Sequence, residues 1–281
     1  MAPRLNAEVS ESVWKSLSDE SEQTGDSLST VVDRALATAF DLERHSLFQV
    51  STSNALVQGV FSGAVTVRDL KRNGDFGLGT FDRLDGELIM LDGVCYRATG
   101  GGVVTSPPDD ARVPFAVVTH FRSDLSLATG PGSLTDLTTA LDGARPSENL
   151  FVGIQVSGIF ERLSLRAACA AESGENLLEA TAHQSEFRVV DIEGTLVGFW
   201  APLYARAVNV PGYHFHFLSK DRDLGGHVLD MQTGPLEVGI HVESELHIAI
   251  PETEEFLAAD LSGDHQDALH QAETGKTSRS E

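Results

Sequence analysis

The stretch YHFHFLSKDRDLGGHVLD, Tyr213–Asp230, decides how we expect the second half of this chain to fold. Its first five residues alternate aromatic and histidine side chains, a pattern typical of a β-strand, in which successive side chains point to opposite faces. His214 and His216 therefore share one face, while the aromatic residues face a core. A turn-rich segment follows, and His227 begins the next apolar strand. If the two strands pair as a hairpin, His227 lies beside the first two histidines.

Three histidines that converge in this way predict a zinc site at His214, His216 and His227. Zinc is bound by imidazole nitrogens at roughly 2.0–2.1 Å, and catalytic zinc sites keep three protein ligands and one open position. Most of the other histidines, such as His45 and His183, are expected to be ordinary surface or core residues. The spacing predicts a metal and leaves the reaction open, because the same pattern occurs in cupins and in carbonic anhydrases.

A cupin-like metalloenzyme is one alternative. Its metal site would need a glutamate three or four residues beyond His216 on the same strand, where this chain has Ser219 and Lys220. A second histidine segment, Gly239-Ile240-His241, keeps this alternative open.

Composition restricts the partners of the chain. The 281 residues include 42 acidic and 20 basic side chains, for a formal charge of −22, which opposes binding to nucleic acids and to anionic membranes. The two cysteines, Cys95 and Cys169, are too few for a disulfide framework and indicate a reduced cytoplasm. No apolar stretch approaches the ~18 residues of a membrane span. We therefore expect a soluble, cytoplasmic protein of one large domain or two ordinary ones.

The first 45 residues differ from the rest. Arg4–Val9 alternates polar and apolar residues like a strand, Glu11 to about Gln23 reads as a helix, Thr24-Gly25 breaks it, and an amphipathic helix follows from Leu28 to Phe40. This order resembles a ribbon–helix–helix unit, which normally pairs with a second copy because a unit of this size cannot bury its own core. We therefore expect residues 1–45 to form an arm of this kind.

The arm has two candidate roles. In the ribbon–helix–helix family, outward residues of the paired strands read DNA bases, and those positions correspond here to Arg4, Asn6 and Glu8. The arm holds nine acidic and four basic residues, which opposes DNA binding, so we favour an oligomerisation role. A DNA-binding regulator with an enzyme-derived sensor domain remains the second alternative function.

From Leu47 onward the chain consists mostly of short β-type runs separated by glycine turns. A hairpin is predicted where Glu87–Leu91 and Val94–Ala98 flank Asp92-Gly93. The other expected strands are Leu56–Ser62, Phe115–Phe121, Phe151–Ser157, Ile159–Ser164, Phe187–Glu193, Leu196–Pro202, Tyr213–Ser219, His227–Asp230, Leu236–Val242 and Leu246–Ala249. Helices are expected at Thr66–Asn73, Leu134–Leu141 and Asp264–Glu273. The predicted divisions are 46–145, 146–273 with the zinc site, and a flexible tail at 274–281.

Two long motifs resemble those of α-acetolactate decarboxylase: Gly74–Ala98 (GDFGLGTFDRLDGELIMLDGVCYRA) and Tyr213–Asp230, with a similar C-terminal helix at Leu261–Glu273. The resemblance covers roughly Leu47 to Glu273 and excludes the arm. It implies a mostly β, two-domain α+β fold with mixed sheets and a homodimer. It also implies zinc-dependent conversion of 2-acetolactate, a small-molecule substrate, to acetoin and carbon dioxide.

The resemblance also implies site residues. The family's histidine ligands fall on His214, His216 and His227, its threonine and first glutamate on Thr80 and Glu87, its arginine on Arg166 and its second glutamate on Glu273. Arg162 lies near Arg166, but its offset from Gly158 does not match the family motif. Without this resemblance, Thr80 would be interpreted as an ordinary strand residue and Glu87 as a solvated turn residue. Arg166 would be interpreted as a surface cation and Glu273 as a solvent-exposed residue.

The chemistry of each implied residue is consistent with decarboxylation. Loss of carbon dioxide from a β-keto acid leaves a carbanion, and Zn²⁺ is a Lewis acid that can stabilise the resulting charge. The planar fork of Arg166 suits a substrate carboxylate. A carboxylic acid with a raised pKa, Glu87 or Glu273, can deliver the proton that replaces carbon dioxide.

Overall fold

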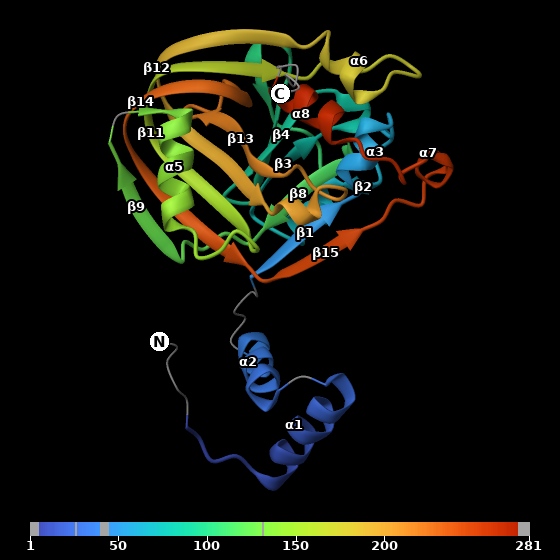
Figure 1. Cartoon of the computed structure of the whole chain (residues 1–281), viewed down its shortest axis with the longest axis vertical. Helices are drawn as coiled ribbons and strands as arrows, with labels where there is room; N and C mark the ends of the chain where they lie inside the picture. The colour runs from blue at the N-terminus through green and yellow to red at the C-terminus, as the bar shows by residue number, and fades with distance from the viewer. Residues whose placement is uncertain (1–5, 26, 40–44, 131, 275–281) are drawn as a thin grey trace. The chain divides into compact units, whose positions relative to one another are not determined.

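The computed structural model describes residues 6–25, 27–39, 45–130 and 132–274 (Figure 1). The chain divides into two compact units, Met1–Arg44 and His45–Glu281. Within the described residues, no helix combines the length and the apolar character that a membrane span requires.

The smaller unit contains two helices, as predicted. Helix α1 (Glu11–Thr24) begins at Ser10, whose hydroxyl accepts a hydrogen bond from the amide of Val13, and ends at Gly25, which has φ of 75°. Helix α2 (Leu28–Ala39) follows. Of the strand predicted at Arg4–Val9, Arg4 and Leu5 lie outside the described residues, and residues 6–9 do not form a strand. A single arm offers such a strand no partner, so its formation would need a second chain.

The larger unit contains a seven-stranded mixed sheet. In spatial order its strands are β15 (Glu245–Ala249), β1 (Ser46–Val50), β8 (Phe115–Thr119), β3 (Phe76–Thr80), β4 (Glu87–Leu91), β5 (Val94–Ala98) and β6 (Val104–Thr105). Strands β1 and β15 are parallel and the other neighbours are antiparallel. The predicted hairpin of β4 and β5 is confirmed, with Asp92 and Gly93 in the left-handed region at its turn.

A second sheet of six strands carries the histidines. Its strands are β9 (Leu125–Thr129), β10 (Gly132–Ser133), β11 (Phe151–Ala167), β12 (Ser185–Ala201), β13 (Gly212–Ser219) and β14 (Gly225–Glu243). Strand β14 pairs with both β11 and β13, and β12 pairs with both as well, so the pairings of these four strands run in a closed circuit. A short pair, β2 (Val65–Thr66) and β7 (Arg112–Val113), completes the strands.

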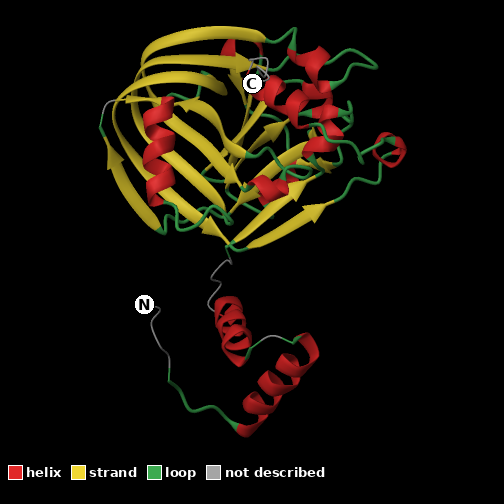
Figure 2. Ribbon diagram, viewed as in Figure 1, coloured by secondary structure: helices red, strands yellow, loops and turns green. Residues whose placement is uncertain are grey.

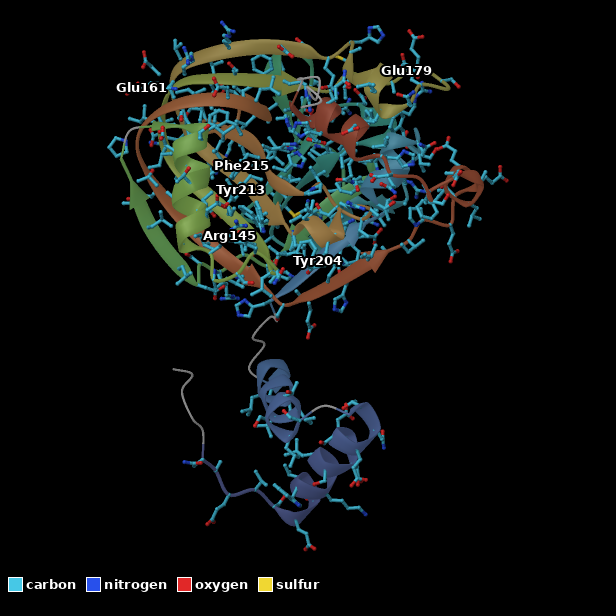
Figure 3. All side chains as sticks on the ribbon, viewed as in Figure 1. Arg145, Glu161, Glu179, Tyr204, Tyr213 and Phe215 are labelled. Carbon is cyan, nitrogen blue, oxygen red and sulfur yellow. The ribbon has the colours of Figure 1, made fainter. Side chains whose placement is uncertain are left out.

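Short helices cover this framework (Figure 2). They are α3 (Ser53–Val57), α4 (Val67–Lys71), α5 (Leu134–Ala144), α6 (Leu177–Thr181), α7 (Glu254–Ala258) and α8 (Gln266–Thr274). Leu137 and Leu141 of α5 pack on the apolar side chains of the six-stranded sheet. Figure 3 shows Tyr213, Phe215 and Arg145 near this helix, and the Tyr213 hydroxyl donates to Asp142 at 2.8 Å.

The two sheets share one apolar core. Phe76, Leu78 and Ile89 of the seven-stranded sheet contact the same buried cluster as Phe199 and Leu218 of the six-stranded sheet. Residues from α3, α6 and α8 join this cluster. The core thereby fixes three helices and both sheets around one region of the molecule.

Several predicted elements need correction. The run predicted as a strand at Leu56–Ser62 begins instead within helix α3, which Thr52 caps through its side chain. The paired predictions Phe151–Ser157 and Ile159–Ser164 form the single strand β11, because Gly158 stays in register with Gly194 and does not form a turn. Two other long strands also join pairs of predicted strands. Strand β12 contains Phe187–Glu193 and most of Leu196–Pro202, and β14 contains His227–Asp230 and Leu236–Val242.

Candidate active site

The three histidines meet where β13 and β14 pair. His216 lies directly opposite His227, and His227 lies opposite Arg166 of β11 on its other side. His214 is two residues before His216 on the same strand face, while Phe215 is buried in the opposite core. The predicted hairpin and the predicted division of faces are therefore confirmed.

The imidazole nitrogens of these residues converge. His214 Nε2 lies 3.2 Å from His216 Nε2 and 3.0 Å from His227 Nδ1. Donor atoms about 2.0–2.1 Å from one zinc ion in a tetrahedral site are separated by roughly 3.3 Å, so these spacings fit a single ion. The three side chains form a group that could hold a metal ion.

The outer nitrogens of two histidines fix the tautomers. His216 Nδ1 lies 2.8 Å from the Leu88 carbonyl and His227 Nε2 lies 2.9 Å from the Glu273 carbonyl, and each ring must donate its N–H there. Their other nitrogens then carry lone pairs that face each other across the centre. Lone pairs that converge in this way suit a cation, and ring N–H groups held by backbone carbonyls are typical of metal ligands.

Burial favours the neutral form of these rings. It lowers the pKa of His214 to about 3, with a further lowering by the nearby Arg166 guanidinium, and it lowers the pKa of His216 to about 3. The pKa of His227 falls in the same direction, for the same first cause. Neutral imidazole is the form that binds a metal.

Glu87 and Thr80 come from the seven-stranded sheet, where they are cross-strand neighbours on β4 and β3. Glu87 Oε1 accepts a hydrogen bond from the Ala168 amide at 3.0 Å, and Oε2 lies 3.5 Å from His216 Nε2. Burial raises the pKa of Glu87 to about 7, although Arg166 lowers it. The Thr80 hydroxyl donates to the Gly86 carbonyl at 3.0 Å.

Arg166 is buried beside the histidines. One of its terminal nitrogens, Nη1, donates to the Ala272 carbonyl of helix α8, and its Nε is buried without a hydrogen-bond partner in the described structure. A buried, incompletely paired guanidinium is costly unless an anion binds it. Arg162, four residues earlier on β11, is exposed.

Glu273 reaches the same centre from helix α8. Its Oε2 lies 3.6 Å from His214 Nε2 and 3.7 Å from His227 Nδ1. Burial raises the pKa of Glu273, and Arg166 opposes that shift. The structure therefore brings all seven predicted site residues together, from five strands and one helix.

Two cavities adjoin this centre. A small cavity of about 50 Å³ is lined by every predicted site residue and by apolar residues such as Leu84 and Phe115. A larger space of about 570 Å³ lies against His214, His227 and Glu273 and is also lined by residues of α5 and α8. The small cavity suits a compact molecule, and the larger space borders the same side chains.

Gln184 also lies at this site, although the sequence did not predict it. This side chain lines the small cavity, and its Oε1 is buried without a hydrogen-bond partner in the described structure. Gln184 directly precedes β12, after helix α6, and that helix was not predicted. No pattern around a lone glutamine points to such a position, since only the fold brings α6 to the centre.

Comparison with known proteins agrees with this architecture. Residues 47–263 match the family described as alpha-acetolactate decarboxylase. The alpha-acetolactate decarboxylase of Methylococcus capsulatus is 42% identical over 233 residues, covering 82% of this chain and 90% of that protein. The enzyme of Methanosarcina mazei is 39% identical over 229 residues, covering 81% and 80%. A crystal structure of the Bacillus subtilis enzyme superposes with a TM-score of 0.79 at 33% identity, covering 82% of this chain and all of that one.

The fold and the set of side chains around the small cavity define an enzyme, a carboxy-lyase that acts on a small molecule. The chain belongs to the alpha-acetolactate decarboxylase family. The predicted fold class, a mostly β α+β fold with mixed sheets, is confirmed.

Proposed function

We propose that this protein converts 2-acetolactate to acetoin and carbon dioxide with a zinc ion held by His214, His216 and His227. The observation that carries the proposal is the small cavity of about 50 Å³, where these histidines meet an arginine and two carboxyl groups. When bound there, zinc would supply a Lewis acid that offsets the negative charge left when carbon dioxide departs. We name 2-acetolactate as the substrate because the chain belongs to the alpha-acetolactate decarboxylase family.

Arg166 is proposed to bind the substrate carboxylate. Its guanidinium is buried, and Nε has no hydrogen-bond partner among the described residues, so a carboxylate can form charge-assisted hydrogen bonds there. The Ala272 carbonyl holds one terminal nitrogen and thereby orients the fork. Binding of the substrate carboxylate at Arg166 would place the carbon–carbon bond that breaks beside the histidines.

Glu87 is proposed to hold the proton that replaces carbon dioxide. The Ala168 amide occupies Oε1, which leaves Oε2, 3.5 Å from His216 Nε2, as the oxygen that can carry the proton. Glu273 lies beside the other two histidines, His214 and His227. A carboxyl group held in a fixed position can deliver the proton to one face of a planar carbanion.

Gln184 is proposed to accept a hydrogen bond from the substrate hydroxyl. Its Oε1 is buried, lacks a partner in the described structure and belongs to a residue that lines the cavity. Leaving a buried amide oxygen unpaired is unfavourable, so a hydroxyl donor would bind there. Gln184→Leu should therefore raise KM for acetolactate and reduce discrimination against 2-keto acids that lack the hydroxyl.

The function is tested by an acetoin assay. Purified protein is incubated with racemic 2-acetolactate before and after removal of metal by a chelator, and again after zinc is restored. We expect metal-dependent acetoin formation, a large loss of turnover in Arg166→Ala, and near-normal turnover in Arg162→Ala, which removes an exposed arginine of the same strand. Absence of acetoin from zinc-loaded protein would refute the proposal.

The arm is proposed to pair with the arm of a second chain in a homodimer. Helix α1 buries none of its residues, and Val13 and Trp14 are 45% and 55% exposed. An apolar groove of about 580 Å³ within the arm is lined by Val13, Leu17, Val31 and Ala35 together with three polar residues. Apolar surface of this kind on so small a unit favours association with a second copy.

Light scattering on the full chain, on a variant without residues 1–44 and on Trp14→Glu tests the arm. We expect the full chain to show a larger assembly than either variant, and an unchanged assembly size would contradict the proposal. DNA binding is the competing role, and an electrophoretic shift at low salt that is lost with the arm would favour it.

A further inference from the structure

A second cluster of metal-binding side chains lies outside the candidate active site. His241 belongs to β14, Asp124 directly precedes β9, and His45 directly precedes β1. Asp124 Oδ2 lies 3.3 Å from His241 Nδ1 and 3.5 Å from His45 Nδ1. The two imidazole rings stack with centroids 4.8 Å apart. Three residues distant in sequence thus place one ligand atom each around a common point.

The far side of His241 shows an unusual arrangement. His241 Nε2 is buried without a hydrogen-bond partner in the described structure, and the buried carboxyl oxygens of Glu243 have only a weak side-chain contact with Thr119. His241 Nε2 lies 3.5 Å from Glu243 Oε1, and the two residues are 3% and 1% exposed. Burial raises the pKa of Glu243 to about 8, and a buried imidazole nitrogen without a partner beside it is rare and needs a physical explanation.

We propose that His45, Asp124 and His241 bind a divalent transition-metal ion through His45 Nδ1, Asp124 Oδ2 and His241 Nδ1, and that this ion accounts for the arrangement around His241 Nε2. The separations of 3.3 and 3.5 Å are close to the roughly 3.3 Å expected between ligands of a tetrahedral zinc ion. Binding moves the ring proton of His241 from Nδ1 to Nε2, and Nε2–H then donates to the carboxylate of Glu243. This is the metal–histidine–carboxylate arrangement that orients ligands in metal sites.

The existing contacts of the cluster are compatible with this exchange. In the metal-free form His241 Nδ1 donates to the Arg122 carbonyl at 2.7 Å, a bond that the cation replaces. Asp124 Oδ2 also accepts from the Val242 amide at 2.8 Å, which fixes the carboxylate in place. Half of the His45 side chain and about a third of Asp124 are exposed, so an ion can enter from solvent and keep water in its open position.

The donor set selects the kind of ion. Two imidazoles and one carboxylate favour Zn²⁺, Co²⁺ or Ni²⁺ over Ca²⁺ and Mg²⁺, which prefer oxygen ligands. The ion would join the residues that directly precede β1 and β9 to strand β14. The residues of this site are separate from those of the candidate active site.

The test is metal stoichiometry of the full-length chain. Protein stripped with a chelator is titrated with Zn²⁺ against a colorimetric competitor, and bound zinc is then measured by mass spectrometry after desalting. We expect two equivalents in the wild type and one in either His45→Ala or Asp124→Asn, both at partly exposed positions. Asparagine can still accept from the Val242 amide, so Asp124→Asn should stay folded and retain acetoin formation.

Two further variants complete the test. His247→Ala removes an exposed histidine of β15 that lies 3.4 Å from Glu245, and it should keep two equivalents. His216→Ala should keep the one equivalent bound by this second cluster. The second site would be overturned if the wild type bound one equivalent of zinc and His216→Ala bound none. It would also be overturned if Asp124→Asn still bound two equivalents of zinc. Loss of zinc in Asp124→Asn but not in His216→Ala would instead overturn the proposed active-site metal.

Discussion

The C-terminal end of helix α8 contributes two different groups to the centre, and they can be separated by experiment. The Glu273 carboxylate lies 3.6 Å from His214 Nε2, whereas the Glu273 carbonyl accepts the His227 Nε2–H at 2.9 Å. Glu273→Gln removes the charge and keeps the carbonyl, while truncation after Ala272 removes both. Loss of an outer partner of a metal-bound histidine typically weakens metal affinity about 10–100-fold, or roughly 1.4–2.7 kcal/mol.

We therefore expect the truncated chain to lose about 10–100-fold in zinc affinity as well as turnover. Glu273→Gln should lose turnover and keep an affinity near that of the wild type. Affinity is measured by competition with a chelator of known constant, alongside initial rates of acetoin formation at saturating zinc. A chain that ends at Thr274 keeps both Glu273 groups and serves as the matched control. Wild-type zinc affinity in the chain truncated after Ala272 would refute the role assigned to the carbonyl.

Three further outcomes are expected. Glu87→Gln keeps an acceptor for the Ala168 amide but no acidic proton, so kcat should fall about 10²–10⁴-fold with zinc content unchanged, as measured by turnover and metal analysis. Gly198→Ala would place a Cβ only 2.1 Å from the Phe215 ring, so overpacking should destabilise the fold by about 1–3 kcal/mol and lower Tm by several degrees in a thermal melt. Cys95 is 3% exposed and burial raises its pKa to about 12, so iodoacetamide should alkylate Cys169 and spare Cys95 in the native protein, as peptide mass spectrometry would show.

The histidine centre could be predicted because its geometry is local. Alternation along one strand places His214 and His216 on the same face, and a hairpin needs only a turn to bring His227 beside them. The hairpin of β4 and β5 was predictable for the same reason, from Asp92-Gly93. In both cases the information lies within about twenty residues of sequence.

The remaining site residues depend on contacts between distant segments. Glu87 approaches His216 only because the two sheets pack against each other, and Ala168 follows a strand of 17 residues that the sequence pattern divided at Gly158. Glycine is a frequent turn residue, so the pattern could not show that Gly158 pairs across the sheet with Gly194. Gln184 was missed because no motif precedes it. The family resemblance, and not periodicity, supplied Thr80, Glu87, Arg166 and Glu273.

The position of Glu273 depends on how helix α8 packs. A helix of nine residues is too short to be stable alone in water, since isolated helices need roughly 12–15 residues. Its order therefore comes from docking, and Leu269 and Ala272 are each 2% exposed within the core that both sheets share. The same docking places the Ala272 carbonyl at Arg166 and the Glu273 carbonyl at His227. Apolar burial of one short helix thus sets the orientation of an arginine, a histidine and a carboxylate together, which couples packing at this end of the chain to the chemistry of the site.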